Sequence, residues 1–235
     1  MDLFEIMSEI ESLATERMKK LYVSQGAREP LFGVATGALK PIAKKIKKNQ
    51  PLAEELYATG NYDAMYLAGM IADPKNMTPA DFDRWIEKAY FHMISDYIVA
   101  VTLAETDFAQ VVADKFIASG SELVMSAGWS CYQWLIGSRK DIEFDRRKLL
   151  SMLEAVEKNI HTQPNRTRYA MNNFVIAVGV SFIPLHEEAM RTAERIGEIS
   201  VLSGKGVCSL LNAFESIKSE TQKGRLGFKR KNVRC

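Results

Sequence analysis

Apolar residues recur along this chain at intervals of three and four residues, the spacing that places them on one face of an α-helix. The segments between stop signals such as glycine and asparagine are long enough for helices, and no convincing set of alternating strands accompanies them. Only residues 175–183 could form either a strand or a buried helix. The clearest stripes are Leu3, Ile6, Met7, Ile10 and Leu13; Ala64, Leu67, Ala68 and Ile71; and Leu149, Met152, Leu153 and Val156.

The predicted helices group into pairs of similar length. Thr78-Pro79-Ala80-Asp81 predicts one helix start, because it combines a hydroxyl cap, a proline in the first turn and a carboxylate near the positive end of the helix dipole. Four segments each fit two helices in a length near that of armadillo and HEAT-like repeats, which bury their apolar faces by stacking on one another. A compact helical bundle is the alternative. The four segments are 36–72, 78–118, 120–158 and 166–198.

The composition is that of an ordinary globular protein. Of the 235 residues, 47% are hydrophobic and 26% are charged, which argues against disorder, collagen or a disulfide scaffold. We expect a single domain over residues 1–235, with a basic tail at about 223–235. We also expect a cytoplasmic protein that does not associate with membranes, because no apolar run could span a bilayer and the first residues do not resemble a signal peptide. The oligomeric state stays open.

The familiar motifs of catalysis and metal binding are missing from the sequence. Its three cysteines and three histidines lack metal-ligand spacing, so we predict neither a metal site nor a cofactor. The segment 203–206 (SGKG) is too short to wrap a triphosphate, and no GxSxG elbow occurs. Cys131 fits a small core residue better than a nucleophile, because no histidine lies near it in the sequence.

Positive charge is concentrated in two stretches. Residues 40–49 contain five lysines and residues 223–235 contain six basic residues, neither with an acid, so the rest of the chain is net acidic although the whole carries +2. Such segregation favours a polyanionic partner. The alternative, for the lysines at 40–49, is a solvated helix face.

Two segments combine aromatic or basic side chains with helical spacing. Trp129 lies in SAGWSCYQWL and can either pack between helices or offer a stacking face to a base or sugar. Arg166 and Arg168 lie at the start of an otherwise apolar helix, where they can either contact phosphates or cap the preceding turn.

Four segments spread over nearly the whole chain carry a resemblance to a known family. They are GAREPLFGVATGALKPIAKKIKK, LYATGNYDAMYLAGMIAD, HTQPNRTRYAMNNFVIAVG and RLGFKRKNVRC. With these segments the chain resembles the AlkD-like DNA alkylation repair family, and the resemblance implies an all-α fold of HEAT-like repeats stacked as a curved α-solenoid.

The resemblance also points to a difference in catalytic residues. The active glycosylases of that family use a tryptophan, and an aspartate four residues later, to stabilise the cationic sugar as an alkylated purine leaves. Here Ser95 and Val99 stand at those two positions. Asp96 is the remaining carboxylate, but on an α-helix it would lie about 60° around the axis and about 4.5 Å along it from Val99.

We therefore predict a DNA-binding HEAT-like repeat protein without base-excision activity, which contacts the phosphate backbone. One alternative is a divergent glycosylase that excises alkylated purines, with Asp96 as its carboxylate and Tyr97 or Trp129 as its stacking face. Another is a protein-interaction scaffold. The predicted phosphate contacts are Arg28, Lys44, Lys45, Lys47, Lys48, Arg166, Arg168, Lys229, Arg230 and Lys231.

Overall fold

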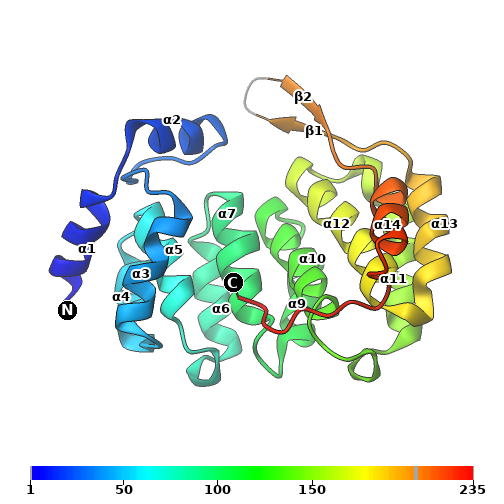
Figure 1. The fold of residues 1–235 in the computed structure, drawn as a ribbon, viewed down its shortest axis with the longest axis horizontal. Helices are drawn as coiled ribbons and strands as arrows, with labels where there is room; N and C mark the ends of the chain where they lie inside the picture. Colours follow the sequence, from blue (N-terminus) through cyan, green and yellow to red (C-terminus); the bar gives the residue numbers. More distant parts are fainter. Residues whose placement is uncertain (1, 204–205, 235) are drawn as a thin grey trace. The chain divides into compact units, whose positions relative to one another are not determined.

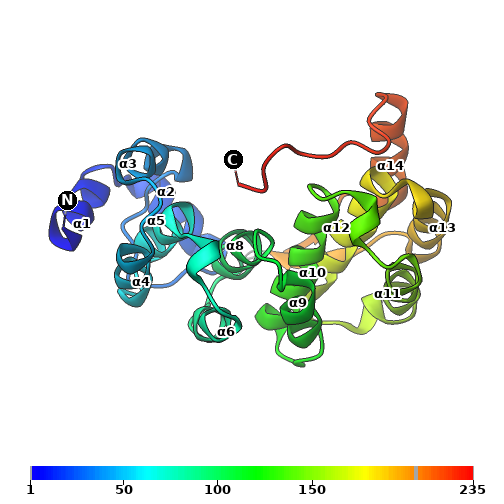
Figure 2. The ribbon, with the colours of Figure 1, turned by 90° about the horizontal axis from the view of Figure 1, so that it is seen from below.

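The computed structural model of the chain describes residues 2–203 and 206–234, with the backbone alone at 203 and 206–208. Its contacts cluster into two compact units: the residues up to Thr106 together with Arg234, and Asp107–Val233 (Figures 1 and 2). Helices make up most of both units, which confirms the predicted all-α class. A single domain over the whole chain stays a prediction.

The first unit is built from short helices joined by tight turns. Apolar residues of α5 are fully buried at Ala64, Leu67, Ala68 and Ile71, as their spacing predicts. The elements are α1 (Leu3–Ser12), α2 (Glu16–Ser24), a 3-10 turn (Thr36–Leu39), α3 (Lys40–Ile46), α4 (Gln50–Ala58), α5 (Tyr62–Ile71), a 3-10 turn (Pro74–Asn76), α6 (Pro79–Glu87), α7 (His92–Ile94), a π-helical turn (Ser95–Val99) and α8 (Ala100–Leu103).

Local capping explains where several of these helices begin. The predicted start of α6 is confirmed: Thr78 and Asp81 form a capping box, with Pro79 in the first turn. At α1, the side chain of Asp2 accepts from the backbone of Glu5 and the side chain of Glu5 accepts from Asp2. These reciprocal bonds satisfy backbone donors that the first turn of a helix leaves unpaired.

A buried carboxylate fixes the loop between α2 and the turn at Thr36. Asp63 of α5 is fully buried, and its oxygens accept from the backbone N–H groups of Phe32 at 2.7 Å, Gly33 at 3.0 Å and Val34 at 2.9 Å. Gly33 has a φ of 93°, and a Cβ there would lie 2.6 Å from the backbone nitrogen of Lys19. Only glycine therefore allows this close approach of the loop to α2.

The segment of Ser95 and Asp96 is not α-helical. Residues Ser95–Val99 form a π-helical turn between α7 and α8. The α-helical geometry used above for Asp96 and Val99 is therefore wrong, because i→i+5 hydrogen bonding changes the angle and the rise per residue. Turns of this kind occur frequently at functional sites.

The second unit contains longer helices and a small hairpin. Here α10 packs against α9 on one side and α12 on the other (Figures 1 and 2). The elements are α9 (Ala109–Ile117), α10 (Glu122–Ile136), a 3-10 turn (Asp141–Glu143), α11 (Arg146–Asn159), a 3-10 turn (Ile160–Thr162), α12 (Asn165–Ser181), a 3-10 turn (Ile183–Leu185), α13 (His186–Ile196), β1 (Ser200–Ser203), β2 (Gly206–Ser209) and α14 (Ala213–Gln222).

The predicted helix pairs are confirmed in the second half of the chain. Residues 120–158 hold two α-helices, α10 and α11, and residues 166–198 hold α12 and α13, whereas 36–72 and 78–118 each hold more than two α-helices. Most of the doubtful segment 175–183 belongs to α12. The antiparallel hairpin, in which Val201 pairs with Cys208, was not predicted. Residues 204 and 205 of the SGKG segment lie outside the described residues.

The described residues contain neither a single membrane-spanning helix nor a cluster of metal ligands. No single helix there is long and apolar enough to cross a membrane, although α12 and the segment Ile183–Ile196, separated by a bend of 114°, are together long and apolar enough. No group of three or more histidine, cysteine, aspartate or glutamate side chains could hold a metal ion.

Candidate nucleic-acid interface

A lysine cluster lies at the end of α3 in the first unit. All four of its members are exposed. The ammonium groups of Lys45 and Lys48 are 3.5 Å from carboxylates of Glu9 and Asp73, and such exposed pairs contribute little to stability. Lys44 and Lys47 have no carboxylate partner within the described part of the chain. The cluster, Lys44, Lys45, Lys47 and Lys48, therefore presents positive charge to solvent.

Two of these lysines also have a structural explanation. Lys44 and Lys45 occupy the last turn of α3, where positive charge complements the negative end of the helix dipole. Lys47 and Lys48 follow the helix, so this effect does not account for the whole cluster.

The backbone of Lys47 is strained. It caps α3 with a φ of 64° and a ψ of −161°, a region that glycine occupies freely and other residues avoid. At the corresponding position of α13 the chain has Gly197, with a φ of 59° and a ψ of −141°. Strain of this kind clusters at functional sites. A lysine where glycine would fit better therefore favours a role for its charge.

The arginines at the start of α12 belong to the second unit. The backbone N–H of Arg166 donates to Glu122 at 2.7 Å, and the carbonyl of Arg166 accepts from the hydroxyl of Ser126 at 3.3 Å. The side chains of Arg166 and Arg168 are half-buried, and the Nε of Arg168 has no hydrogen-bond partner among the described residues. No side chain caps the start of α12. Both interpretations of these arginines, as phosphate contacts or as caps of the preceding turn, stay predictions.

The basic tail is docked on the second unit. The ammonium of Lys229 donates to the carbonyl of Ile136 at 2.7 Å and lies 2.8 Å from a carboxylate oxygen of Asp141. The guanidinium of Arg230 lies 4.8 Å from the ring centroid of Trp134. Lys231 is exposed. The structure thus gives Lys229 and Arg230 partners within their own unit.

The carboxylate of Asp96 is enclosed. Asp96 is 3% exposed, and the hydroxyl of Ser95 donates to it at 2.8 Å. Ser95 and Val99, at the positions of the tryptophan and second aspartate of the glycosylases that this chain resembles, are fully buried. The segment therefore offers a substrate neither a stacking face at Ser95 nor a carboxylate at Val99.

The stacking candidates differ in exposure. Trp129 is 5% exposed, and its ring packs edge-to-face on Phe174 with centroids 5.1 Å apart. Tyr97 is half-buried. The structure places Trp129 among the packing residues of α10 and α12.

Comparisons with known proteins agree with this architecture. The sequence profile of a family described as DNA alkylation repair enzyme matches residues 6–196. The uncharacterized proteins Lin0241 of Listeria innocua and Lmo0209 of Listeria monocytogenes are 29% and 28% identical over 220 residues, which cover 91% of this chain and 95% of each relative.

A solved structure shows the similarity in three dimensions. It is 62% identical, has a TM-score of 0.95, and covers 100% of both chains. It is described as a new family of proteins related to the HEAT-like repeat DNA glycosylases with affinity for branched DNA structures. The predicted HEAT-like repeat fold is therefore confirmed.

Proposed function

Because the chain belongs to the DNA alkylation repair enzyme family, we propose that it binds DNA through the phosphate backbone and excises no base. The observation that carries the proposal is the exposed lysine cluster, in a chain similar over its whole length to a protein with affinity for branched DNA. Branched DNA is the substrate class that this similarity favours.

The exposure of the lysine cluster and the backbone strain at Lys47 both fit a role in binding phosphates. Each lysine that neutralises a phosphate releases a counterion, so binding weakens steeply as salt is added. Lys45 and Lys48 would exchange weak, exposed ion pairs for phosphates at little cost. The basic residues proposed to contact phosphates are Lys44, Lys45, Lys47 and Lys48 of the first unit and Arg166, Arg168 and Lys231 of the second.

Lys229 and Arg230 have a different proposed role. Their hydrogen-bond, ion-pair and cation–π partners lie in the second unit, so we assign them to holding the tail in place there. Arg28 stacks on Tyr90 in the first unit, and we do not count it among the phosphate contacts.

The lack of base excision is proposed from the site around Asp96. A carboxylate assists departure of a base by lying against the sugar on which positive charge develops. Asp96 is buried and accepts a hydrogen bond from Ser95, and Val99 has no charge to offer. Neither residue is poised for this task.

The test is a salt titration of binding to a four-way DNA junction. The double variant Lys44→Gln, Lys48→Gln should lower the slope of log affinity against log salt by about 2, since each phosphate contact contributes about 0.9. Lys218→Gln, at an exposed lysine of α14, is the matched control and should leave the slope unchanged. A double variant with the slope of the wild type would contradict the proposal.

A further inference from the structure

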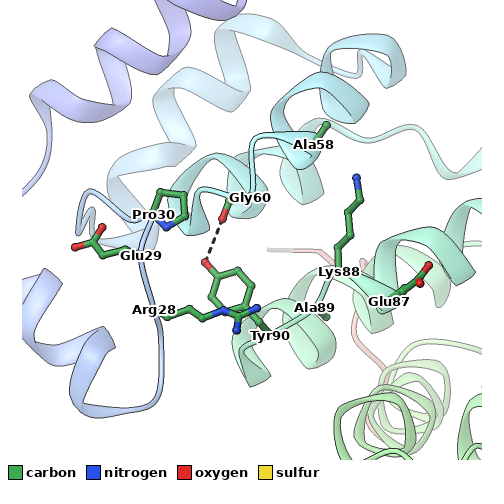
Figure 3. A pocket seen from close by; sticks show the side chains of 9 residues that line it. All are labelled: Arg28, Glu29, Pro30, Ala58, Gly60, Glu87, Lys88, Ala89 and Tyr90. Carbon is green, nitrogen blue, oxygen red and sulfur yellow. Dashed lines mark hydrogen bonds between the residues drawn. The ribbon is translucent and has the colours of Figure 1, made fainter.

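A pocket of about 360 Å³ opens on the first unit, away from the lysine cluster in the sequence. The loop before α3 contributes Arg28, Glu29 and Pro30; the end of α4 contributes Ala58 and Gly60; and the end of α6 contributes Glu87 to Tyr90. Its volume lies at the small end of the range for ligand pockets. The residues that line it are shown in Figure 3.

The wall of the pocket is a stack of a guanidinium on an aromatic ring. The guanidinium carbon of Arg28 lies 4.7 Å from the ring centroid of Tyr90 (Figure 3). The hydroxyl of Tyr90 donates to the carbonyl of Gly60 at 3.2 Å, which holds the ring in place. Arg28 is exposed, so its side chain is accessible from solvent. Guanidinium planes of this kind stack on unpaired bases.

The phenol of Tyr90 is neutral at neutral pH. An ordinary tyrosine, with a pKa of about 10, is already protonated there, and burial raises the pKa of Tyr90 further, to about 12, although the nearby Arg28 acts in the opposite direction. The ring therefore carries no negative charge that would bind the guanidinium more tightly or repel an anion.

The acidic groups at the rim are directed elsewhere. The carboxylate of Glu29 pairs with the ammonium of Lys19 at 2.7 Å and accepts from the backbone of Leu31 at 3.0 Å, on the side away from Tyr90 (Figure 3). The carboxylate of Glu87 also points away from the stack (Figure 3). Lys88 extends toward Ala58 and has no carboxylate partner among the residues that the structure describes.

We propose that this pocket binds one unpaired nucleotide of a DNA strand, with its base on the guanidinium of Arg28 and its phosphate near Lys88. The choice of ligand rests on the proposed DNA binding. A base within a duplex has both faces covered by its neighbours, so only an unpaired base can lie on a single stack. Ends, gaps and branch points supply such bases.

The test uses the full chain and separates stacking from charge. Arg28→Lys keeps the positive charge but loses the flat guanidinium. With labelled pentathymidylate as probe, it should lower affinity by about 5- to 150-fold, the loss expected for one stacked base. Arg147→Lys, the same change at an exposed arginine of α11, is the control and should leave the affinity unchanged.

A plain duplex, titrated in parallel, keeps the two proposals apart. Pentathymidylate binding that depends on Arg28 supports the pocket even if duplex and junction binding are absent, in which case only the proposed function fails. If pentathymidylate does not bind, or if Arg28→Lys binds it like the wild type, the pocket inference is overturned, whatever the duplex does.

Discussion

Replacing Lys47 by glycine should stabilise the protein while weakening its binding to DNA. Lys47 has a φ of 64° and a ψ of −161°, and a non-glycine residue in this region costs about 1–3 kcal/mol. Glycine removes that cost but gives the unfolded chain more freedom, worth about 0.5–1 kcal/mol. The exposed side chain has no carboxylate partner among the described residues, so little else is lost. We expect a net gain of about 1 kcal/mol.

Lys44→Gly is the matched variant. Lys44 lies within α3, where glycine should lower the free energy of unfolding by about 0.5–1 kcal/mol. Both variants lose one positive charge from the cluster and gain one glycine, so each should lower the salt slope of DNA binding by about 1. The two free energies of unfolding should therefore differ by about 2 kcal/mol, with Lys47→Gly the more stable.

Urea unfolding followed by circular dichroism measures this difference. A higher midpoint for Lys47→Gly than for the wild type, and a lower one for Lys44→Gly, is the expected result. Equal destabilisation by both glycines would refute the argument that the backbone of Lys47 is strained.

Four further substitutions test the packing. Gly128→Ala should lower the free energy of unfolding, measured in urea, more than Gly179→Ala does. The new Cβ at residue 128 meets a backbone carbonyl of α9, whereas the one at residue 179 meets the side chain of Ile217, which can shift more easily. Equal losses would contradict this. Asp63→Asn should lower the free energy of unfolding by about 2–4 kcal/mol, since three backbone donors lose a charged acceptor. An unchanged free energy of unfolding would contradict this role of Asp63. Burial raises the pKa of the Cys131 thiol, so this thiol should not react with iodoacetamide in the folded protein. Cys131→Ala should therefore lower the number of thiols alkylated in urea by one and leave the number alkylated in the folded protein unchanged.

Helix positions could be predicted from local spacing because the sequence repeats the period of the helix. Ile6 and Ile10 are fully buried on α1, although Leu13, at the end of the same stripe, is 38% exposed because the helix stops there. Leu149 and Leu153 likewise lie in the core of the second unit. Periodicity thus identified which face of each helix is buried, but not the residue at which the helix ends.

Contacts between residues far apart in the chain could not be predicted from the sequence. The partner of Lys229 is Ile136, 93 positions away, and nothing local indicates that pairing. Arg28 and Tyr90 come from two separate segments of the first unit, and the pocket that they line is built from three. The strands of the hairpin, SVLS and GVCS, do not alternate apolar and polar residues, so the pattern could not reveal them. The π-helical turn at Asp96 has no recognised sequence signature.

We propose that the protein binds DNA without releasing bases. The most direct measurement is a titration with a four-way junction that carries alkylated purines, in which bound DNA and released bases are quantified in the same samples. We predict binding that weakens steeply with salt and no release above that of DNA alone. Release that Asp96→Asn abolishes would contradict the claim, as would the absence of binding at low salt.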